Sequence, residues 1–201
     1  ALELISQLKA EGIKMSHIDI GGGVGIAYNE EETINIEKYV QSVIDKVGDL
    51  EVILEPGRAI VGNAGIFVTQ VEYLKQSGVK SFAIIDGAMN DLQRPSLYGS
   101  YHQAIAVEDS SEGTKDTWDL VGPICETGDF LAKDRELTLA QGDYIALMSA
   151  GAYGFVLSSN YNSRPRVAEV MVSGSEHALV RKRETVGSLF ENEFILNNEI
   201  N

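Results

Sequence analysis

Two short motifs that could bind an anion follow apolar runs. The glycine cluster at residues 21–23 comes directly after the run 17–20, and the motif E-P-G-R at residues 55–58 comes after V-I-L at residues 52–54. Consecutive glycine amides after a strand can bind a phosphate, and an arginine offers a permanent fork of donors. Because active sites of barrels gather at the carboxyl ends of their strands, we expect the two motifs to share a site. Taken singly, the glycine cluster is explained equally well as a tight turn, and E-P-G-R is explained better as an ordinary strand exit with a solvated arginine.

The single cysteine, Cys125, lies in the motif C-E-T-G-D at residues 125–129. Its acidic neighbours disfavour the thiolate, so a proton donor suits this position better than a nucleophile or a redox thiol. A small buried hydrophobe is the alternative. One cysteine also excludes an internal disulfide and fits a reducing compartment.

Two further stretches could recognise a small ligand. Arg94 and Tyr98 lie in Q-R-P-S-L-Y and could bind a carboxylate through the guanidinium fork and the hydroxyl. Tyr153 stands among small residues in S-A-G-A-Y-G, which leaves space for a flat ligand beside its ring. The ordinary alternatives are a surface loop for the first stretch and an exposed turn for the second. Arg164 and Arg166 are expected to form structural ion pairs.

Composition excludes several classes of partner. The 201 residues carry 16 Lys and Arg against 30 Asp and Glu, a formal charge of −14. Binding a polyanion needs a basic surface, so we exclude nucleic acid and anionic membranes. No apolar run approaches the ~20 residues of a membrane-spanning helix, and we expect a soluble, cytoplasmic protein. The histidines are scattered, so no metal site is predicted.

The elements that position these motifs change in type after E-P-G-R. Apolar residues at helical spacing predict helices at residues 1–11 and 36–47, and short apolar runs predict strands at 17–20 and 52–54. This alternation is typical of a parallel sheet, with strand 52–54 buried on both faces. Two such strands cannot close a barrel. We expect this part of the chain to be completed by absent partners or by unusual packing on the residues after E-P-G-R.

Beyond that motif the pattern predicts an antiparallel β region. Gly, Asn, Ser and Pro punctuate short apolar runs that have no strong helical period. The expected strands are residues 66–75, 81–86, 117–125, 143–148, 167–172 and 177–182. An amphipathic helix is expected at residues 186–194. We therefore divide the chain into residues 1–60, a barrel remnant, and residues 61–201, a β domain.

In chain order, the motifs resemble the diaminopimelate decarboxylase family. They are H-I-D-I-G-G-G-V-G, V-I-L-E-P-G-R, Q-R-P-S-L-Y, C-E-T-G-D and S-A-G-A-Y-G followed by N-Y-N-S-R-P-R. The resemblance implies a fold-type-III pyridoxal 5'-phosphate enzyme of α/β plus all-β architecture. This chain would hold the last quarter of a (β/α)8 barrel, then an antiparallel β-barrel or sandwich with a C-terminal helix. The implied reaction is conversion of meso-2,6-diaminopimelate to L-lysine and CO2 in lysine biosynthesis.

The resemblance also implies roles for residues of this chain. Cofactor-binding residues would be Gly21, Gly22, Gly23, Glu55, Pro56, Gly57, Arg58 and Tyr153, with the glycine amides at the phosphate and Glu55 at the pyridine nitrogen. Substrate-binding residues would be Arg58, Arg94, Tyr98, Glu126 and Tyr153. Cys125 would be the catalytic proton donor, and Cys125 and Glu126 would reach across a homodimer interface into the partner's site.

One departure from the family pattern stands beside these matches. The family's cofactor-holding lysine and its ring-stacking histidine belong to early barrel strands, and no lysine of this chain matches the lysine's motif. We therefore expect little or no decarboxylase activity from the 201 residues alone. Two other interpretations stay open: a same-fold decarboxylase acting on arginine or carboxynorspermidine, and a non-catalytic β-domain dimerisation module.

Overall fold

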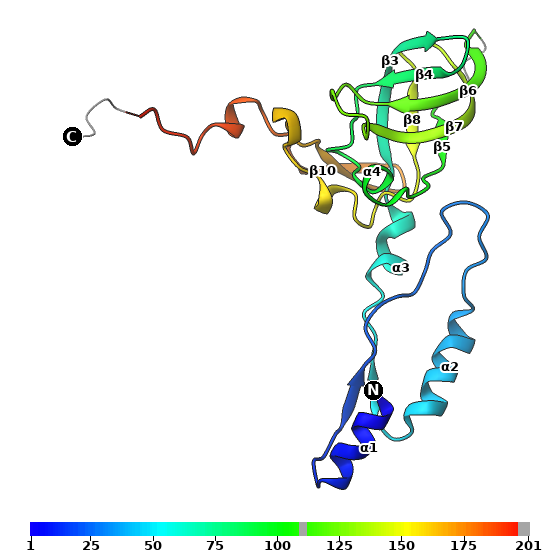
Figure 1. Ribbon diagram of the computed structural model, residues 1–201, viewed down its shortest axis with the longest axis vertical. Helices are drawn as coiled ribbons and strands as arrows, with labels where there is room; N and C mark the ends of the chain where they lie inside the picture. Colours follow the sequence, from blue (N-terminus) through cyan, green and yellow to red (C-terminus); the bar gives the residue numbers. More distant parts are fainter. Residues whose placement is uncertain (109–111, 197–201) are drawn as a thin grey trace.

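The structure, a computed structural model, describes residues 1–108 and 112–196. Residues 1–56 form an N-terminal arm that projects from a β domain (Figure 1). The arm contains α1 (Leu2–Ala10), β1 (His17–Asp19), α2 (Ile36–Val47) and β2 (Glu51–Ile53). The short helices α3 (Gly57–Val61) and η1 (Gly62–Ala64) then lead into the β domain.

The arm has a small core of its own. β1 and β2 pair in parallel with Ile18 opposite Val52, and Ile5, Ile18 and Leu50 are buried together. Asn35 begins α2 by accepting a hydrogen bond from the Lys38 amide at 2.9 Å, and Gly48 with φ of +65° ends it. The two helices and the parallel strand pair predicted from the sequence are confirmed.

The burial predicted for the second strand is wrong in this chain. Ile53 is 39% exposed, and α2 contains no buried residue. In the described part of the chain the sheet of β1 and β2 has only these two strands, and no residue of β2 is fully buried. The apolar residues of β2 and α2 therefore remain in contact with solvent.

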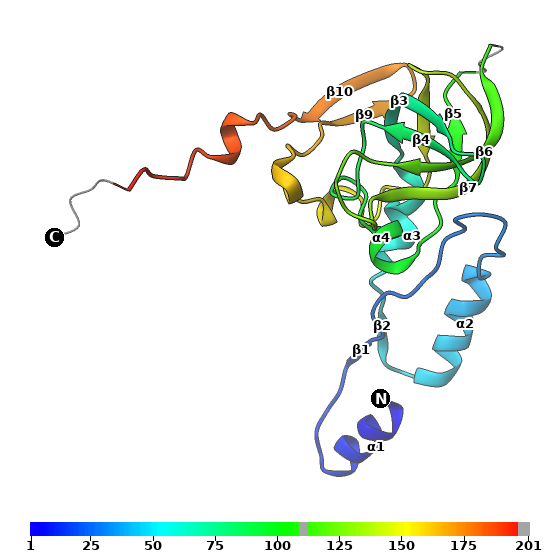
Figure 2. The same cartoon turned by 45° about the horizontal axis from the view of Figure 1, so that its top comes forward.

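The β domain is a six-stranded sheet in the order β5-β8-β3-β4-β6-β7. Its strands are β3 (Phe67–Gln76), β4 (Ser81–Ile85), β5 (Ala104–Ala106), β6 (Thr114–Val121), β7 (Phe130–Leu139) and β8 (Tyr144–Leu147). The two outer strands of this order, β5 and β7, contact each other, so the sheet curls into a nearly closed barrel (Figures 1 and 2). One contiguous core fills it, with Val71, Trp118, Leu120, Ile145 and Leu147 among its members.

Two predictions about this sheet need correction. β4 and β6 pair in parallel, whereas the sequence pattern predicted only antiparallel neighbours. The connection between these two strands contains α4 (Arg94–Tyr98) and β5, which gives the chain enough length to return in the same direction. The strands β5 and β7 were also not predicted. β7 carries Lys133, Asp134, Arg135 and Glu136 in succession, and Asp134 has a positive φ of 55°, so its apolar alternation is interrupted.

The last described segments lie outside the barrel. β9 (Glu169–Ser173) and β10 (Glu176–Arg181) confirm two of the predicted strands, but they form an antiparallel hairpin separate from the six-stranded sheet, which the sequence did not predict. The helix predicted at residues 186–194 is wrong, because only the single turn η4 (Gly187–Leu189) forms. Thr185 and Ser188 exchange hydrogen bonds there, with each backbone amide donating to the other residue's hydroxyl. Such local bonds compete with helix formation, and Gly187 disfavours a helix further.

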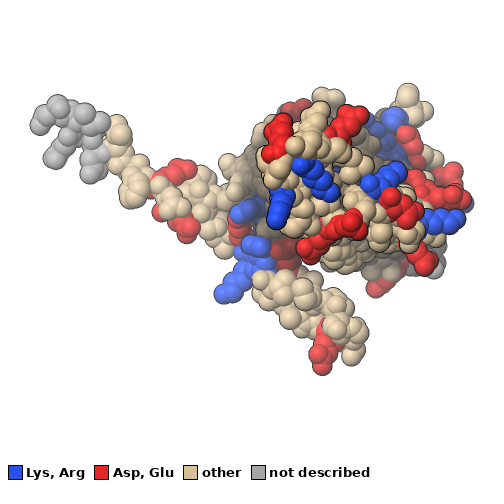
Figure 3. All heavy atoms as spheres, turned by 90° about the horizontal axis from the view of Figure 1, so that it is seen from below, with Lys and Arg blue, Asp and Glu red and all other residues tan. Residues whose placement is uncertain are grey.

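The helices and the surface charge of the folded chain bear on contact with membranes and polyanions. Across the described residues, no helix is both long and apolar enough to cross a membrane. Acidic side chains predominate over the face drawn in Figure 3, and the basic ones are interspersed among them. That face therefore offers no continuous basic patch to a polyanion.

Candidate functional site

The two motifs predicted to bind an anion lie together at the carboxyl ends of β1 and β2. The Glu55 amide donates to the Gly21 carbonyl at 2.8 Å, and a Cβ added at Gly22 would lie 2.5 Å from the Glu55 carbonyl oxygen. Gly21 and Gly23 have φ of +70° and +83°, a region that side chains rarely adopt. All three glycines are therefore required by the backbone at this edge.

Not every glycine amide is available to a ligand. The Gly21 amide donates to Asp19 Oδ1 at 2.8 Å, so an acceptor within the chain already occupies it. The amides of Gly22 and Gly23 have no acceptor among the residues that the structure describes. A phosphate at this edge would therefore meet two free amides.

The loop that follows the glycine cluster runs along α3 and η1 to the β domain. A Cβ at Gly62 would lie 2.4 Å from Ile26 Cδ1, so Ile26 packs directly against the helix backbone. Asn63 Nδ2 donates to the Ala27 carbonyl at 3.1 Å and to Ser149 Oγ at 2.8 Å. One side chain thus joins the glycine loop to the S-A-G-A-Y-G turn.

The S-A-G-A-Y-G turn packs against the end of α3, backbone to backbone. The Gly151 amide donates to the Gly62 carbonyl at 3.0 Å, and a Cβ at Gly151 would lie 1.9 Å from the Val61 carbonyl oxygen. Ser149 and Tyr153 both have positive φ, 59° and 60°. Such strained positions in non-glycine residues are typical of functional turns. The turn places the Tyr153 ring beside Arg94, whose guanidinium carbon lies 5.8 Å from the ring centroid.

Arg94 is a buried cation at the start of α4. Only 8% of the residue is exposed, and no carboxylate among the described residues lies within salt-bridge distance of it. Its NH1 donates to the Tyr28 hydroxyl at 2.5 Å, and its guanidinium carbon lies 4.9 Å from the Tyr28 ring centroid. Burying an unpaired charge is costly, and aromatic faces offset that cost only in part. A guanidinium in this environment is suited to binding an anion.

His102 lies behind Tyr28 and is fully buried. Its Nδ1 lies 2.8 Å from the Met148 carbonyl oxygen, which can only accept, so Nδ1 carries a proton. Burial lowers the pKa of His102 despite this bond, and the charges of Arg94 and Arg135 lower it further. The ring meets Tyr28 edge to face, with centroids 5.4 Å apart and planes at 82°.

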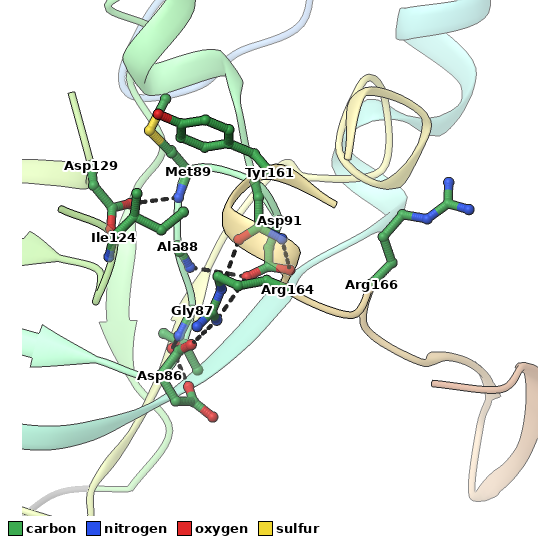
Figure 4. Close-up of polar contacts among 12 residues, drawn as sticks. Asp86, Gly87, Ala88, Met89, Asp91, Ile124, Asp129, Tyr161, Arg164 and Arg166 are labelled. Atoms are coloured by element: carbon green, nitrogen blue, oxygen red, sulfur yellow. Dashed lines mark hydrogen bonds and ion pairs between the residues drawn. The ribbon is translucent and has the colours of Figure 1, made fainter. Parts of the chain in front are cut away.

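The C-E-T-G-D loop is held from beneath by Asp129. Its Oδ1 accepts from the Met89 amide at 2.7 Å and its Oδ2 from the Ile124 amide at 2.6 Å (Figure 4). Cys125 is exposed at the loop surface, which excludes the buried alternative for this chain as it stands. Glu126 accepts a hydrogen bond from the Tyr161 hydroxyl at 3.4 Å.

A second polar cluster fixes the segment that carries Tyr161. Arg164 donates from Nε to Asn90 Oδ1 at 2.9 Å and from NH2 to the Asp86 carbonyl at 2.6 Å, and it lies 3.6 Å from Asp91 Oδ2 (Figure 4). Burial raises the pKa of Asp91, while the Ala88 amide and the Arg164 charge oppose that rise. The structural ion pairs predicted for Arg164 and Arg166 are confirmed, the second with Glu184 at 2.8 Å.

Comparison with known proteins assigns the chain to one family. The family described as "Pyridoxal-dependent decarboxylase, C-terminal sheet domain" matches residues 16–151. The chain belongs to this family. The match begins at the first strand of the arm and ends in the S-A-G-A-Y-G turn, before the N-Y-N-S-R-P-R motif.

The relatives of this chain include several diaminopimelate decarboxylases. That of Vibrio cholerae is 53% identical over 198 residues, covering 97% of this chain and 47% of the relative. A crystal structure of the Helicobacter pylori diaminopimelate decarboxylase complexed with L-lysine aligns with TM-score 0.86 and 40% identity, covering 94% of this chain and 47% of that one. The chain thus spans about half the length of the relatives it matches.

Some of the site residues predicted from the sequence come together and others do not. Gly22 contacts Glu55, and Tyr153 lies beside Arg94. Ser96 Oγ donates to the Gly128 carbonyl, which ties α4 to the C-E-T-G-D loop. Tyr98, Cys125 and Glu126 are all exposed, and no hydrogen bond within the described residues joins them to the predicted cofactor-binding residues. The sequence did not single out Tyr28, Asn63 or His102; only the position of Tyr28 at the end of G-G-G-V-G-I-A-Y gave a signal.

Proposed function

We propose that this chain is the C-terminal portion of a cytoplasmic diaminopimelate decarboxylase. Joined to the remaining half of such an enzyme, it would convert meso-2,6-diaminopimelate to L-lysine and CO2 with pyridoxal phosphate. The Vibrio cholerae and Helicobacter pylori relatives, at 40–53% identity over more than nine-tenths of this chain, support the proposal. The division at residue 60 into a barrel remnant and a β domain belongs to the same proposal.

Arg94 is the observation that carries the proposal for the site. It is a buried guanidinium without a carboxylate partner among the described residues, beside Tyr28 and Tyr153. A permanent cation stabilises a carboxylate anion and so opposes its loss as CO2. We therefore assign Arg94 to the carboxylate that remains in L-lysine, with Tyr98, Tyr153 and Arg58 as further substrate contacts.

The residues at the ends of β1 and β2 fit the cofactor that the family name implies. We propose that the amides of Gly22 and Gly23 hold its phosphate, while Gly21 shapes the turn through its positive φ. Glu55, which follows the strand end, would keep the pyridine nitrogen protonated, with Pro56, Gly57, Arg58 and Tyr153 around it. When bound, pyridoxal phosphate supplies an electron sink for the electron pair left behind by departing CO2.

The exposed C-E-T-G-D loop supplies the acid in this proposal. Cys125 would donate a proton to the carbon from which CO2 has left, and Glu126, aligned by the Tyr161 hydroxyl, would bind a substrate amine. Both residues are exposed to solvent in this chain. Their exposure supports a homodimer in which each loop completes the partner's site.

Among same-fold alternatives, arginine has less support as substrate. A viral arginine decarboxylase aligns with TM-score 0.70 but only 22% identity, which shows the shared fold alone. A purely structural dimerisation module would have no use for a buried cation lined by two tyrosines. The substrate therefore remains diaminopimelate in our proposal.

A chimera tests the proposal. Residues 1–201 would replace the matching half of the Vibrio cholerae diaminopimelate decarboxylase, and CO2 release would be measured with meso-diaminopimelate, arginine and carboxynorspermidine. We expect turnover of diaminopimelate only, and little or none from the 201 residues alone. A chimera that folds and binds pyridoxal phosphate, yet releases CO2 from none of these or prefers another, would contradict the proposal.

A further inference from the structure

Tyr28 contacts the buried guanidinium of Arg94 in two ways. Its hydroxyl accepts the hydrogen bond from NH1 at 2.5 Å, and its ring lies under the guanidinium carbon at 4.9 Å. Among the described residues, the Tyr28 hydroxyl is the one side-chain acceptor of the Arg94 guanidinium. The hydrogen bond occupies one guanidinium N–H and the ring lies close to the same group, so together they restrict its position.

The Tyr28 ring is itself held in place. His102 packs edge-on against it at 5.4 Å, and His102 is fixed by the Met148 carbonyl at 2.8 Å. On the backbone side, the Ala27 carbonyl accepts from Asn63, so the residue before Tyr28 is tied to η1. The tyrosine reaches Arg94 from a loop of the arm, across 66 positions of sequence. The position of Tyr28 therefore depends on these tertiary contacts and not on the secondary structure around it.

We propose that Tyr28 is a positioning residue for carboxylate recognition, acting through Arg94. Its hydroxyl accepts from one guanidinium N–H and its ring lies beside the group, which leaves the remaining N–H donors for the carboxylate retained in L-lysine. This inference rests on the proposed function, because it needs Arg94 to bind that carboxylate. It goes beyond it in assigning a role to a loop residue that the site motifs do not contain.

If Tyr28 acts through Arg94, it should affect the binding of ligands that carry a carboxylate and not the binding of ligands that lack one. L-lysine and 1,5-diaminopentane share the same carbon chain and amines and differ by the carboxylate. Loss of the Tyr28 hydroxyl should therefore weaken the binding of L-lysine and leave the binding of 1,5-diaminopentane unchanged. A residue that only stabilises the fold would alter both ligands alike.

The experiment uses the chimera described above with Tyr28→Phe, which keeps the ring, and with Tyr73→Phe as the matched control. Tyr73 is 58% exposed on β3, and its hydroxyl makes no hydrogen bond within the described residues. For Tyr28→Phe we expect the KM for meso-diaminopimelate and the inhibition constant of L-lysine to rise about 3- to 20-fold, with kcat within about twofold. Inhibition by 1,5-diaminopentane should not change, and Tyr73→Phe should behave as the parent.

A double-mutant cycle with Arg94→Lys supplies the second readout. If Tyr28 acts through the guanidinium, Tyr28→Phe should have little further effect once Arg94 is lysine. The inference would be overturned if the inhibition constant of L-lysine did not change in Tyr28→Phe, or if the binding of both ligands were weakened equally. Fully additive effects of Tyr28→Phe and Arg94→Lys would also overturn it. If the parent chimera has no turnover, the proposed function fails, and calorimetric binding of the same two ligands still decides the role of Tyr28.

Discussion

Asp129 should be among the most important polar residues for the stability of the β domain. It is 4% exposed, and its two carboxylate oxygens accept from two different loops, at Met89 and at Ile124. The first loop contains Asp91, which pairs with Arg164, and the second is the C-E-T-G-D loop. The substitution Asp129→Ala removes both hydrogen bonds and leaves two amides without their acceptor.

The expected loss follows from these two bonds. A hydrogen bond to a charged acceptor contributes about 1.5–3 kcal/mol, and the bonds at 2.7 and 2.6 Å are short. Part of the total returns because the variant no longer buries a carboxylate, and the Met89 amide is only partly buried. We therefore expect Asp129→Ala to lower the free energy of unfolding by about 2–4 kcal/mol.

Urea unfolding followed by tryptophan fluorescence measures this loss directly. The chain has one tryptophan, Trp118, which is 1% exposed in the core of the β domain. Asp49→Ala is the control, since Asp49 is exposed and its removal changes the net charge by the same amount. A loss below about 1 kcal/mol for Asp129→Ala, or one equal to the control, would refute the reasoning.

Glu184, His102 and Gly151 each give a further prediction. Hydrogen bonds from Arg166 lower the pKa of Glu184 from 4.5 to about 2, so the stability that Glu184 contributes is complete above pH 4.5 and is lost as the pH falls toward 2. The difference in urea midpoint between the parent and Glu184→Gln should shrink over that window, and a constant difference would contradict it. Burial lowers the pKa of His102, so the stability that its neutral ring contributes is complete above pH 6.5 and is lost as the pH falls below that value. An NMR titration of His102 checks this, and a midpoint at or above 6.5 would contradict it. Gly151→Ala should destabilise the β domain by about 1–3 kcal/mol, because its Cβ would lie 1.9 Å from the Val61 carbonyl oxygen. Gly25→Ala, with open space around it, is the control and should be nearly neutral. Equal urea midpoints for the two variants would count against this packing.

Sequence patterns predicted those parts of the fold that depend on local periodicity. The helices of the arm, its parallel strand pair and the strands β9 and β10 have clear apolar spacing. β7 was not predicted because four consecutive charged residues at its bulge interrupt the apolar alternation. The helix expected near the C-terminus failed because the hydrogen bonds between Thr185 and Ser188 satisfy the backbone locally. In both cases a local pattern was overridden by contacts that the pattern does not record.

The candidate site was predictable only in part for a related reason. The meeting of the glycine cluster with Glu55 follows from the rule that parallel strands end at one edge, and the structure places them in contact. The contact between Tyr28 and Arg94 joins residues 66 positions apart, and it depends on the path of a long polar loop. No periodicity encodes that path. The tertiary structure was therefore needed to recognise Arg94 as buried and without a carboxylate partner among the described residues.

The central claim is that Arg94 binds the carboxylate that the substrate retains, and one measurement tests it most directly. In the chimera, Arg94→Gln should lower kcat/KM for meso-diaminopimelate by about 10- to 100-fold, because a charged pair of hydrogen bonds is lost, while the content of bound pyridoxal phosphate stays the same. Arg183→Gln, at an exposed arginine, should leave kcat/KM unchanged. If folded, cofactor-loaded Arg94→Gln retained kcat/KM within about twofold of the parent, the assignment of Arg94 would be contradicted.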